Sequence, residues 1–156
     1  MKNFATLGIV FFILCVTGFS QESNPAIPMF TSLFSFAGLN GAMPNSGPMI
    51  QATDGNFYGV TQSGGAYNSG EVFQLTPAGE LNVFYSFCSE ANCEDGGTPL
   101  SGLLQAQGAD LYGTTTTGGS HGCGTLYQLT LSGTLTVIHN FCSNSNDVFN
   151  VQCLGH

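Results

Sequence analysis

The sequence almost lacks positive charge. Its 156 residues include a single Lys or Arg, Lys2, against nine Asp and Glu, and the formal net charge is -8. Proteins that bind nucleic acids need cationic side chains to displace the counterions of the phosphates, so a nucleic-acid partner is excluded. Attachment to a membrane surface through basic residues is excluded for the same reason. Beyond Lys2 the chain offers no Arg or Lys to phosphate or carboxylate ligands.

Charge of either sign is scarce, and tryptophan is absent. Charged residues make up 6% of the chain, whereas 42% is hydrophobic, with 13 Phe and 22 Gly. Disordered acidic chains are poor in aromatic residues, so this composition indicates a folded protein. Gly supplies the positive φ angles of tight turns, and many tight turns are typical of all-β folds.

The N-terminus has the pattern of a secretory leader. Lys2 precedes an apolar run over 4–19 that only Thr6 and Thr17 interrupt. A membrane-spanning helix needs about 20 apolar residues, so this run is short for a span. The small residues Gly18 and Ser20 suit a signal peptidase. We therefore predict a signal peptide over 1–20 and a protein that is secreted or displayed on a bacterial cell surface. The alternative is an uncleaved N-terminal anchor.

Six cysteines are present, and export would permit disulfides among them. Without Cys15 of the leader five remain, so at least one is free or paired between chains. Zinc binding is disfavoured, because Cys88 and Cys93 are not followed by a second close pair. We predict one or two disulfides, with the pairing left open, and neither a metal nor a cofactor. The candidate disulfide residues are Cys88, Cys93, Cys123 and Cys142.

An internal repeat organises the chain. The stretch that begins at Gln51 recurs 54 residues later, from Gln105 (105 − 51 = 54). The two copies align without a gap up to Ser143. Such self-similarity indicates duplication of one structural unit. The matching groups are Gln51-Ala52 with Gln105-Ala106, Tyr58-Gly59 with Tyr112-Gly113, Gly64-Gly65 with Gly118-Gly119, Gln74-Leu75-Thr76 with Gln128-Leu129-Thr130, and Phe87-Cys88-Ser89 with Phe141-Cys142-Ser143.

The repeat predicts the following organisation. A partial first repeat over 21–48 contains Phe34-Ser35-Phe36, which is similar to Tyr85-Ser86-Phe87. Repeat unit 1 covers 49–102, repeat unit 2 covers 103–143, and 144–156 is a divergent tail. Within unit 1 we expect strands over 49–52, 57–61, 71–76 and 81–87, separated by turns and a glycine-rich loop. Strict alternation would place Leu81, Val83, Tyr85 and Phe87 on one face, and Leu135, Val137, His139 and Phe141 likewise in unit 2.

Four short antiparallel strands in each unit are typical of a β-propeller blade. We therefore predict an all-β, β-propeller-like array of four-stranded blades. After cleavage 156 − 20 = 136 residues remain, which is about two and a half units of 54, whereas propellers have typically 4–8 blades. The chain is then either a fragment of a longer array or part of an assembly of several chains.

The unit also resembles a known family. Its spacing of Gln-Ala, Asp-Gly-Asn-Phe-Tyr-Gly, Gly-Gly, Phe-x-Leu-Thr-Pro and Tyr-Ser-Phe over 50–87, and more loosely over 104–141, is similar to the GloVer-type tandem repeat of choice-of-anchor bacterial surface proteins. The resemblance implies an exported bacterial protein with many propeller-like repeats and a surface anchor. It implies no activity and contributes no catalytic residue. The chain departs from the pattern at Gly108-Ala109-Asp110, at Leu131 and in the tail.

Two acidic groups could bind a cation, but each has a simpler interpretation. Asp54, Asn56 and Asp110 could be Ca²⁺ ligands, yet Asp-Gly-Asn also suits a hairpin turn, which we favour. Glu90, Glu94 and Asp95 could form a second site, although a solvated loop is the favoured interpretation.

The aromatic and imidazole side chains give the remaining ligand candidates. Tyr58, Tyr67 and Tyr112 could stack on sugar rings, and His121 occupies the position of Tyr67 in unit 2. Packing between blades is the favoured alternative for the tyrosines. His139 stands where unit 1 has Tyr85, which also favours packing.

No sequence motif points to catalysis. Neither Gly-x-Ser-x-Gly nor His-Glu-x-x-His occurs. Glu71 and Glu80 could serve as the carboxylates of a glycosidase, but unit 2 has Thr125 and Thr134 at these positions. We predict no catalytic residues and no defined catalytic activity.

The leading functional hypothesis is an exported repeat protein that acts as an interaction or binding module outside the cell. Its expected partners are an extracellular polysaccharide or a surface protein. The alternative is a fragment of an extracellular carbohydrate-active propeller enzyme whose active site lies in blades that this chain does not include. A third possibility is a degenerate copy without a role of its own.

Overall fold

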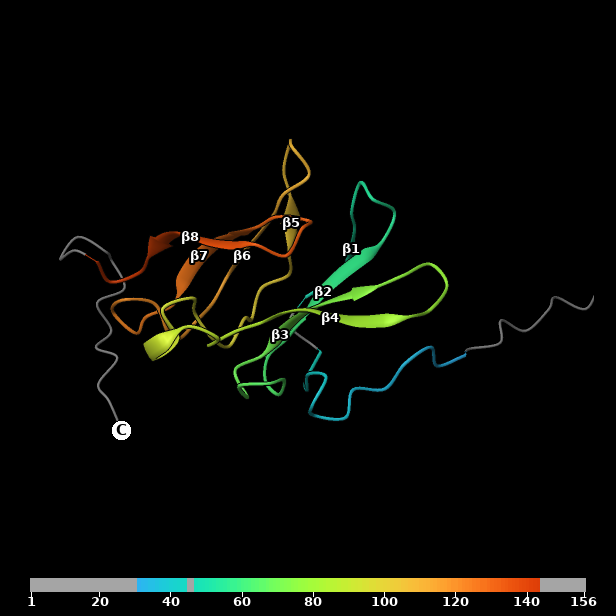
Figure 1. The fold of residues 1–156 in the computed structure, drawn as a ribbon, viewed down its shortest axis with the longest axis horizontal. Helices are drawn as coiled ribbons and strands as arrows, with labels where there is room; N and C mark the ends of the chain where they lie inside the picture. The colour runs from blue at the N-terminus through green and yellow to red at the C-terminus, as the bar shows by residue number, and fades with distance from the viewer. Residues whose placement is uncertain (1–30, 45–46, 144–156) are drawn as a thin grey trace, which may run out of the picture. The chain divides into compact units, whose positions relative to one another are not determined.

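The computed structural model of the chain describes residues 31–44 and 47–143 (Figure 1). The predicted signal peptide, the predicted tail and two cysteines, Cys15 and Cys153, lie outside the described residues. Within the described part no helix is long and apolar enough to cross a membrane.

The first sheet is built from the first full repeat. It contains β1 (Ile50–Gln51), β2 (Phe57–Thr61), β3 (Glu71–Leu75) and β4 (Leu81–Ser86), hydrogen-bonded in chain order and antiparallel throughout. These ranges fall within the expected strands, whose alternating apolar residues suit a sheet packed on its faces. All four predicted strands are therefore present.

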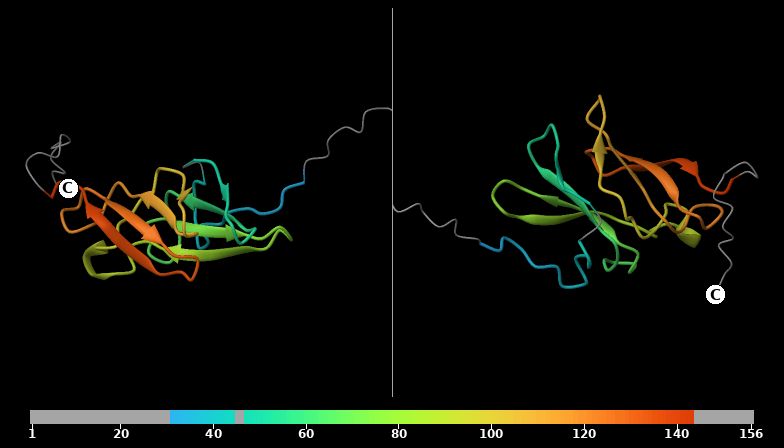
Figure 2. Two further views of the ribbon diagram at one scale, coloured as in Figure 1. Left: turned by 90° about the horizontal axis from the view of Figure 1, so that it is seen from above. Right: turned by 180° about the vertical axis from the view of Figure 1, so that it is seen from behind.

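The second sheet, drawn beside the first in Figure 2, repeats the strand order of the first sheet at the offset of the sequence repeat. It contains β5 (Leu104–Gln105), β6 (Leu111–Thr114), β7 (Thr125–Leu129) and β8 (Leu135–Asn140), again in chain order and antiparallel. One short 3₁₀ helix, η1 (Ala91–Cys93), follows β4 and is the only helical element in residues 31–44 and 47–143. The prediction of an all-β fold of blade-like sheets is confirmed.

A β-bulge at the same repeat position corrects the expected strand-four alternation. The register shifts between Val72 and Phe73 in the first sheet and between Leu126 and Tyr127 in the second. Phe84 is the extra residue on β4, so Val83 pairs with Phe73 whereas Tyr85 pairs with Val72. Because a bulge moves every following side chain to the other face, the prediction of one shared face for residues 81–87 is wrong.

The β3–β4 and β7–β8 hairpins keep their shape despite different sequences. Gly79 and Gly133 both have φ +89, where a Cβ would be strained. The hydroxyl oxygens of Thr76 and Thr130 each accept a hydrogen bond, at 3.1 Å, from the backbone four residues ahead. Leu131 stands at the position of Pro77 and packs against the core, whereas Pro77 is exposed, yet the turn keeps its geometry because Gly and Thr carry it.

The two faces of each sheet have different neighbours. The forward face is defined here by Ile50, Tyr58, Val60, Val72 and Phe84 in the first sheet and by Leu104, Tyr112, Thr114, Leu126 and Ile138 in the second. The rear face is defined by Phe57, Phe73, Leu75, Leu81 and Val83, and by Leu111, Tyr127, Leu129, Leu135 and Val137. The core joins the forward face of the first sheet to the rear face of the second, through Tyr58, Val60, Val72, Leu111, Tyr127 and Leu129.

Residues 31–44 cover part of the remaining rear face of the first sheet. Phe36 contacts Phe73 with ring centroids 5.1 Å apart and planes at 61°. One repeat later Phe87 contacts Tyr127 with the same 5.1 Å separation and an angle of 63°. Residues 34–36 thus take the place on the first sheet that residues 85–87 take on the second.

Candidate functional site

The paired glycines form a joint between successive units. The Gly65 N–H donates to the Gly38 carbonyl at 2.7 Å, and the Gly119 N–H donates to the Cys93 carbonyl at 2.8 Å. A Cβ on Gly64 would lie 2.5 Å from the Gly38 oxygen. Each Gly-Gly loop therefore receives the chain segment that precedes its own unit, and this close backbone approach is the physical reason for the repeated glycines.

That segment in front of the second unit, residues 88–97, is here called the connector. A disulfide joins Cys88 to Cys93, and a second joins Cys123 to Cys142, which fits the expectation of one or two disulfides. Asp95 is fully buried, and its Oδ2 accepts hydrogen bonds from Tyr85 Oη at 2.8 Å and from the Ser89 backbone N–H at 2.9 Å. Asp95 therefore holds the connector together, while Glu90 and Glu94 of the same acidic group are exposed.

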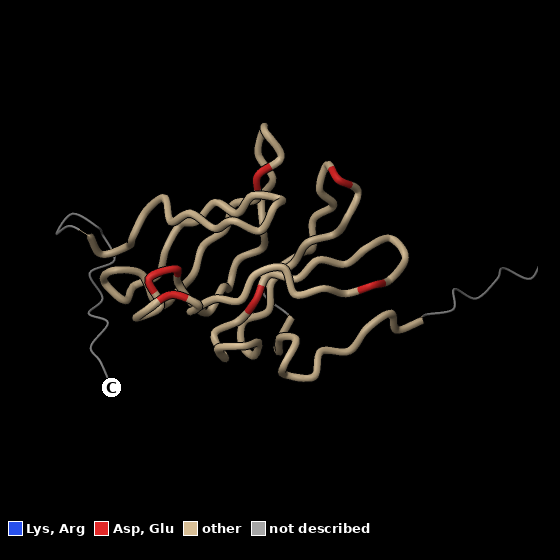
Figure 3. Tube along the Cα trace, in the orientation of Figure 1, with Lys and Arg blue, Asp and Glu red and all other residues tan. Residues whose placement is uncertain are grey.

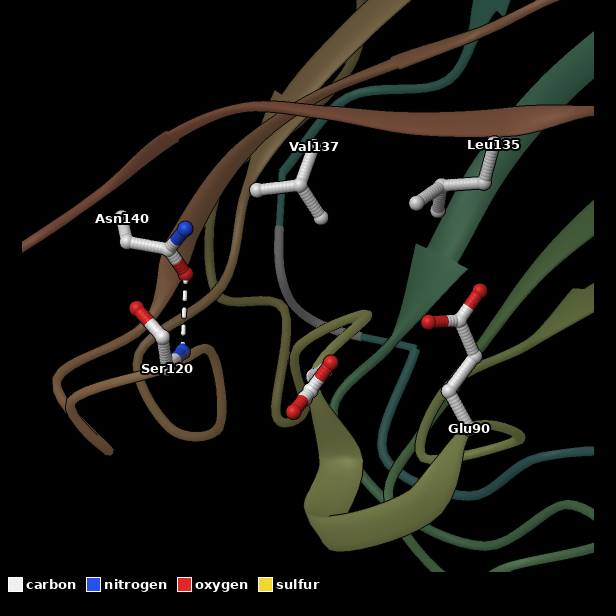
Figure 4. A pocket seen from close by; sticks show the side chains of 6 residues that line it. Glu90, Ser120, Leu135, Val137 and Asn140 are labelled. Atoms are coloured by element: carbon white, nitrogen blue, oxygen red, sulfur yellow. Dashed lines mark hydrogen bonds between the residues drawn. The ribbon is translucent and has the colours of Figure 1, made fainter.

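A pocket of about 210 Å³ lies between the connector and the second sheet (Figure 4). Leu135 and Val137 of β8 supply apolar surface, and the carboxylate of Glu90 points towards them. At the other end the Asn140 Oδ1 accepts a hydrogen bond from the Ser120 backbone N–H at 2.9 Å. The pocket is lined by Glu90, Glu94, Ser120, Leu135, Val137 and Asn140.

The pocket has no neutralising cation. Figure 3 shows Asp and Glu but neither Lys nor Arg over 31–44 and 47–143. No group of three or more His, Cys, Asp or Glu in this part of the chain could hold a metal ion. Exposed carboxylate oxygens beside an aliphatic surface suit a ligand that presents hydrogen-bond donors together with an apolar face.

Asp54 and Asn56, which could be calcium ligands but which we favour as turn residues, serve the hairpin between β1 and β2. Asp54 accepts hydrogen bonds from the Asn56 backbone N–H at 3.1 Å, from Asn56 Nδ2 at 2.9 Å and from Tyr58 Oη at 2.8 Å. Although desolvation acts to raise the pKa of Asp54, the hydrogen bonds from Tyr58 and Asn56 lower it overall. These contacts fit the favoured hairpin interpretation. Asp110 accepts a hydrogen bond from the Gln128 side-chain amide.

The four candidate ligand contacts lie at two pairs of equivalent repeat positions. Tyr58 is buried between the sheets, where its hydroxyl also accepts a hydrogen bond from Gln74 Nε2 at 2.8 Å. Burial raises the pKa of Tyr58. Tyr112 is half-buried on the forward face of the second sheet. Tyr67 is 52% exposed, and the exposed ring of His121 lies with Nδ1 2.8 Å from Ser120 Oγ, so His121 adjoins the pocket lining.

The two glutamates considered for glycosidase chemistry are far from equivalent. Glu71 is 1% exposed, and one of its oxygens accepts a hydrogen bond from Ser86 Oγ at 3.0 Å. Burial raises the pKa of Glu71, and the hydrogen bonds from Ser86 and the Ala66 backbone only partly offset this. Glu80 lies exposed in the turn before β4.

Sequence reasoning missed most of the pocket. Ser120, Leu135, Val137 and Asn140 were not singled out as ligand contacts, and only the connector glutamates had been considered, as a cation site. Two of the missed residues carry a signal, since Ser120 and Asn140 stand where unit 1 has Ala66 and Ser86. Ser120 differs from Ala66 in polarity, and Asn140 differs from Ser86 in size and in its hydrogen-bonding groups, so such differences between the two copies would have pointed to this pocket.

Stacked four-stranded sheets, a glycine joint at each unit and a repeat of 54 residues define a tandem-repeat protein of blade-like β-sheets. The chain belongs to the family of the Gloeobacter/Verrucomicrobia repeat, whose sequence profile matches residues 17–152. No curated protein and no solved structure matches the chain.

Proposed function

We propose that the protein is an exported binding module that acts outside the cell, with an extracellular carbohydrate as the ligand of the connector pocket. The single observation that carries this proposal is the pocket itself, in which exposed carboxylates and an amide lie beside aliphatic side chains. Sugars present hydroxyl donors along their edge and C–H groups on their face, and binding them requires no cation. The disulfide within the connector and the disulfide between Cys123 and Cys142 support an oxidising compartment.

A carbohydrate-active enzyme is the second candidate. Its supporting observation is that two carboxylates, of Glu90 and Glu94, line one pocket, as glycoside hydrolysis requires. Both residues are exposed, however, whereas a general acid usually gains its raised pKa from an apolar surrounding. Binding is therefore the better supported of the two functions.

The test is a panel of extracellular polysaccharides and their oligosaccharides, with binding measured by calorimetry and turnover by release of reducing ends. We expect saturable binding without turnover. The double substitution of Glu90 and Glu94 to Gln should weaken binding about 10-fold, because charged acceptors bind hydroxyl groups more strongly than neutral ones.

Glu80→Gln is the matched control, since it removes an exposed carboxylate outside the pocket. Turnover that is lost in the double variant would establish the enzyme instead. Equal effects of the pocket and control substitutions would contradict a carbohydrate site in the pocket.

A further inference from the structure

We propose that the forward face of the second sheet docks a second copy of this chain, which offers the rear face of its own first sheet. The proposal does not depend on the carbohydrate site. It extends to a pair of chains the contact that already joins the two sheets within one chain.

The forward positions show what normally covers this face. In the first sheet Tyr58, Val60 and Val72 are buried, and Ile50 and Phe84 pack against the same core. At the equivalent positions of the second sheet Leu104 is 66% and Ile138 is 50% exposed, and the side chains between them are only half-buried. The second sheet thus repeats the apolar pattern of an interface whose covering sheet is not supplied by the described residues.

The complementary surface lies on the first sheet. On the second sheet the rear residues Leu111 and Leu129 are fully buried against the core. Their equivalents Phe57 and Leu75 are only half-buried, and Val83 is 45% exposed. Each chain therefore presents both halves of the internal interface, one half on each sheet.

Part of the rear face of the first sheet is already covered by residues 33–43. Phe36 contacts Phe73, Gly38 forms the joint with Gly65, and Leu33 lies near Gly79 of the β3–β4 hairpin. The available part is the surface around Phe57, Leu75 and Val83, which are half-buried or exposed.

Within one chain, the end of β4 and the connector cover part of the second sheet's rear face. In the incoming copy, residues 33–43 already cover the equivalent part of the first sheet. The uncovered remainder of the rear face corresponds to the surface that, on the second sheet, is covered by the forward face of the first sheet.

Charge does not oppose this contact, although each chain has a net charge of -8. The residues that define the two faces are all uncharged. Asp54 and Asp110 lie by the hairpins that join the first two strands of each sheet, and Glu80 lies exposed in the turn before Leu81, at the edge of the rear face (Figure 3). Because the partners use different faces, the association is head-to-tail and forms rings or open chains rather than a closed symmetric pair.

The test compares the mass of the exported, purified chain over a wide concentration range by sedimentation velocity at physiological salt. We expect the mass to rise with concentration in steps of one chain. Ile138→Lys blocks the forward face and Val83→Lys blocks the rear face, and each should weaken self-association at least about 30-fold, since it places an unpaired charge in the interface. Both side chains are about half exposed, so folding should persist, which circular dichroism checks.

The decisive measurement mixes the two variants. Each retains the face that the other has lost, so an equimolar mixture should form a dimer that grows no further. Leu39→Lys is the control, because Leu39 is 89% exposed and belongs to neither face. The proposal is overturned if the unsubstituted chain stays monomeric at every concentration, or if the mixture fails to form the dimer. Association abolished by Ile138→Lys but unaffected by Val83→Lys would indicate a symmetric pair of forward faces and would also overturn it.

Discussion

The two sheets solve one structural problem with different side chains. In the first sheet the buried Glu71 of β3 bonds to Ser86 of β4 and to the backbone of the glycine-rich loop at Ala66. In the second sheet Thr125 replaces Glu71, and Asn140 of β8 accepts the equivalent loop N–H from Ser120. The loop is held in both units, but the group that holds it has moved from the third strand to the fourth. The repeat thus conserves backbone positions, while polar side chains exchange roles between them.

The disulfides differ in the same way. The bond between Cys88 and Cys93 spans 5 residues and closes the connector. The bond between Cys123 and Cys142 spans 19 residues and ties the glycine-rich loop to the end of β8. Unit 1 has Ser69 at the position of Cys123, and the Ser69 hydroxyl donates a hydrogen bond to the Tyr67 carbonyl at 3.2 Å. Although Cys88 and Cys142 are equivalent in the repeat, they stabilise different parts of their units.

Gly118→Ala should have the largest effect, because it breaks the joint between the units. Gly118 has φ +72, and a Cβ would lie 2.5 Å from the Cys93 carbonyl oxygen and 2.8 Å from the Gly96 Cα. Steric overlap with backbone and left-handed strain together should lower the free energy of unfolding by about 4 kcal/mol, as measured by urea denaturation.

Gly108→Ala is the control for strain without overlap. Gly108 has φ +99, but a Cβ there meets nothing within 4 Å. We expect a loss of about 1 kcal/mol. Equal losses in the two variants would show that the glycine pair does not need its close approach.

Removal of the disulfides should have the next largest effect on stability, and the loss should differ between the two disulfides. Loop-closure entropy predicts a loss of about 3 kcal/mol for the double Cys123→Ser, Cys142→Ser variant and about 2 kcal/mol for Cys88→Ser, Cys93→Ser. Thermal denaturation of both variants beside the unsubstituted protein measures the difference. A larger loss from the shorter loop would mean that the connector depends on its disulfide for more than chain entropy.

Glu71→Gln should stabilise the protein in a pH-dependent way. Burial raises the pKa of Glu71 in the folded state, so its neutral form is favoured there. The stability that the protonated Glu71 side chain contributes to the folded state is fully present below the unfolded-state pKa of about 4.3. It is lost as the pH rises through the folded-state pKa. Gln keeps the neutral form, so the variant should gain about 1 kcal/mol at pH 7 and nothing at pH 4.

Urea denaturation at several pH values between 4 and 7 measures this gain. Glu80→Gln controls for the loss of one negative charge at an exposed position. A stability difference between Glu71→Gln and the unsubstituted protein that does not vary with pH would contradict the explanation.

Tyr127→Phe should have the smallest effect on stability. Its sign should be opposite to that of Phe73→Tyr, the reverse substitution at the equivalent position of unit 1. The hydroxyl of Tyr127 is buried without a hydrogen-bond partner among the described residues, and unit 1 has Phe73 at this position. Removal of that hydroxyl should gain about 0.5 kcal/mol, whereas Phe73→Tyr should lose about 1 kcal/mol. Differential scanning calorimetry can resolve both changes. Destabilisation by Tyr127→Phe would indicate that the hydroxyl has a partner, such as a buried water.

Much of the fold was predictable because local features repeat. The strand positions followed from apolar residues and Gly turns, and the duplicated Tyr-Gly and Gly-Gly groups fixed the offset. The alternation failed at Phe84, because a bulge depends on how a strand pairs with its neighbour and leaves no mark in the strand's own pattern. The role of Asp95 was missed for a similar reason, since its hydrogen-bond donors meet it only in the folded connector.

The sequence by itself determined the class of fold and the repeat length, since these depend on composition and on short-range or duplicated patterns. The tertiary structure alone decided which cysteines pair, which glutamate is buried and where a pocket opens. These properties arise from contacts between segments far apart in the chain. Ser120 and Val137 acquire a common surface with Glu90 only when the connector folds against the second sheet.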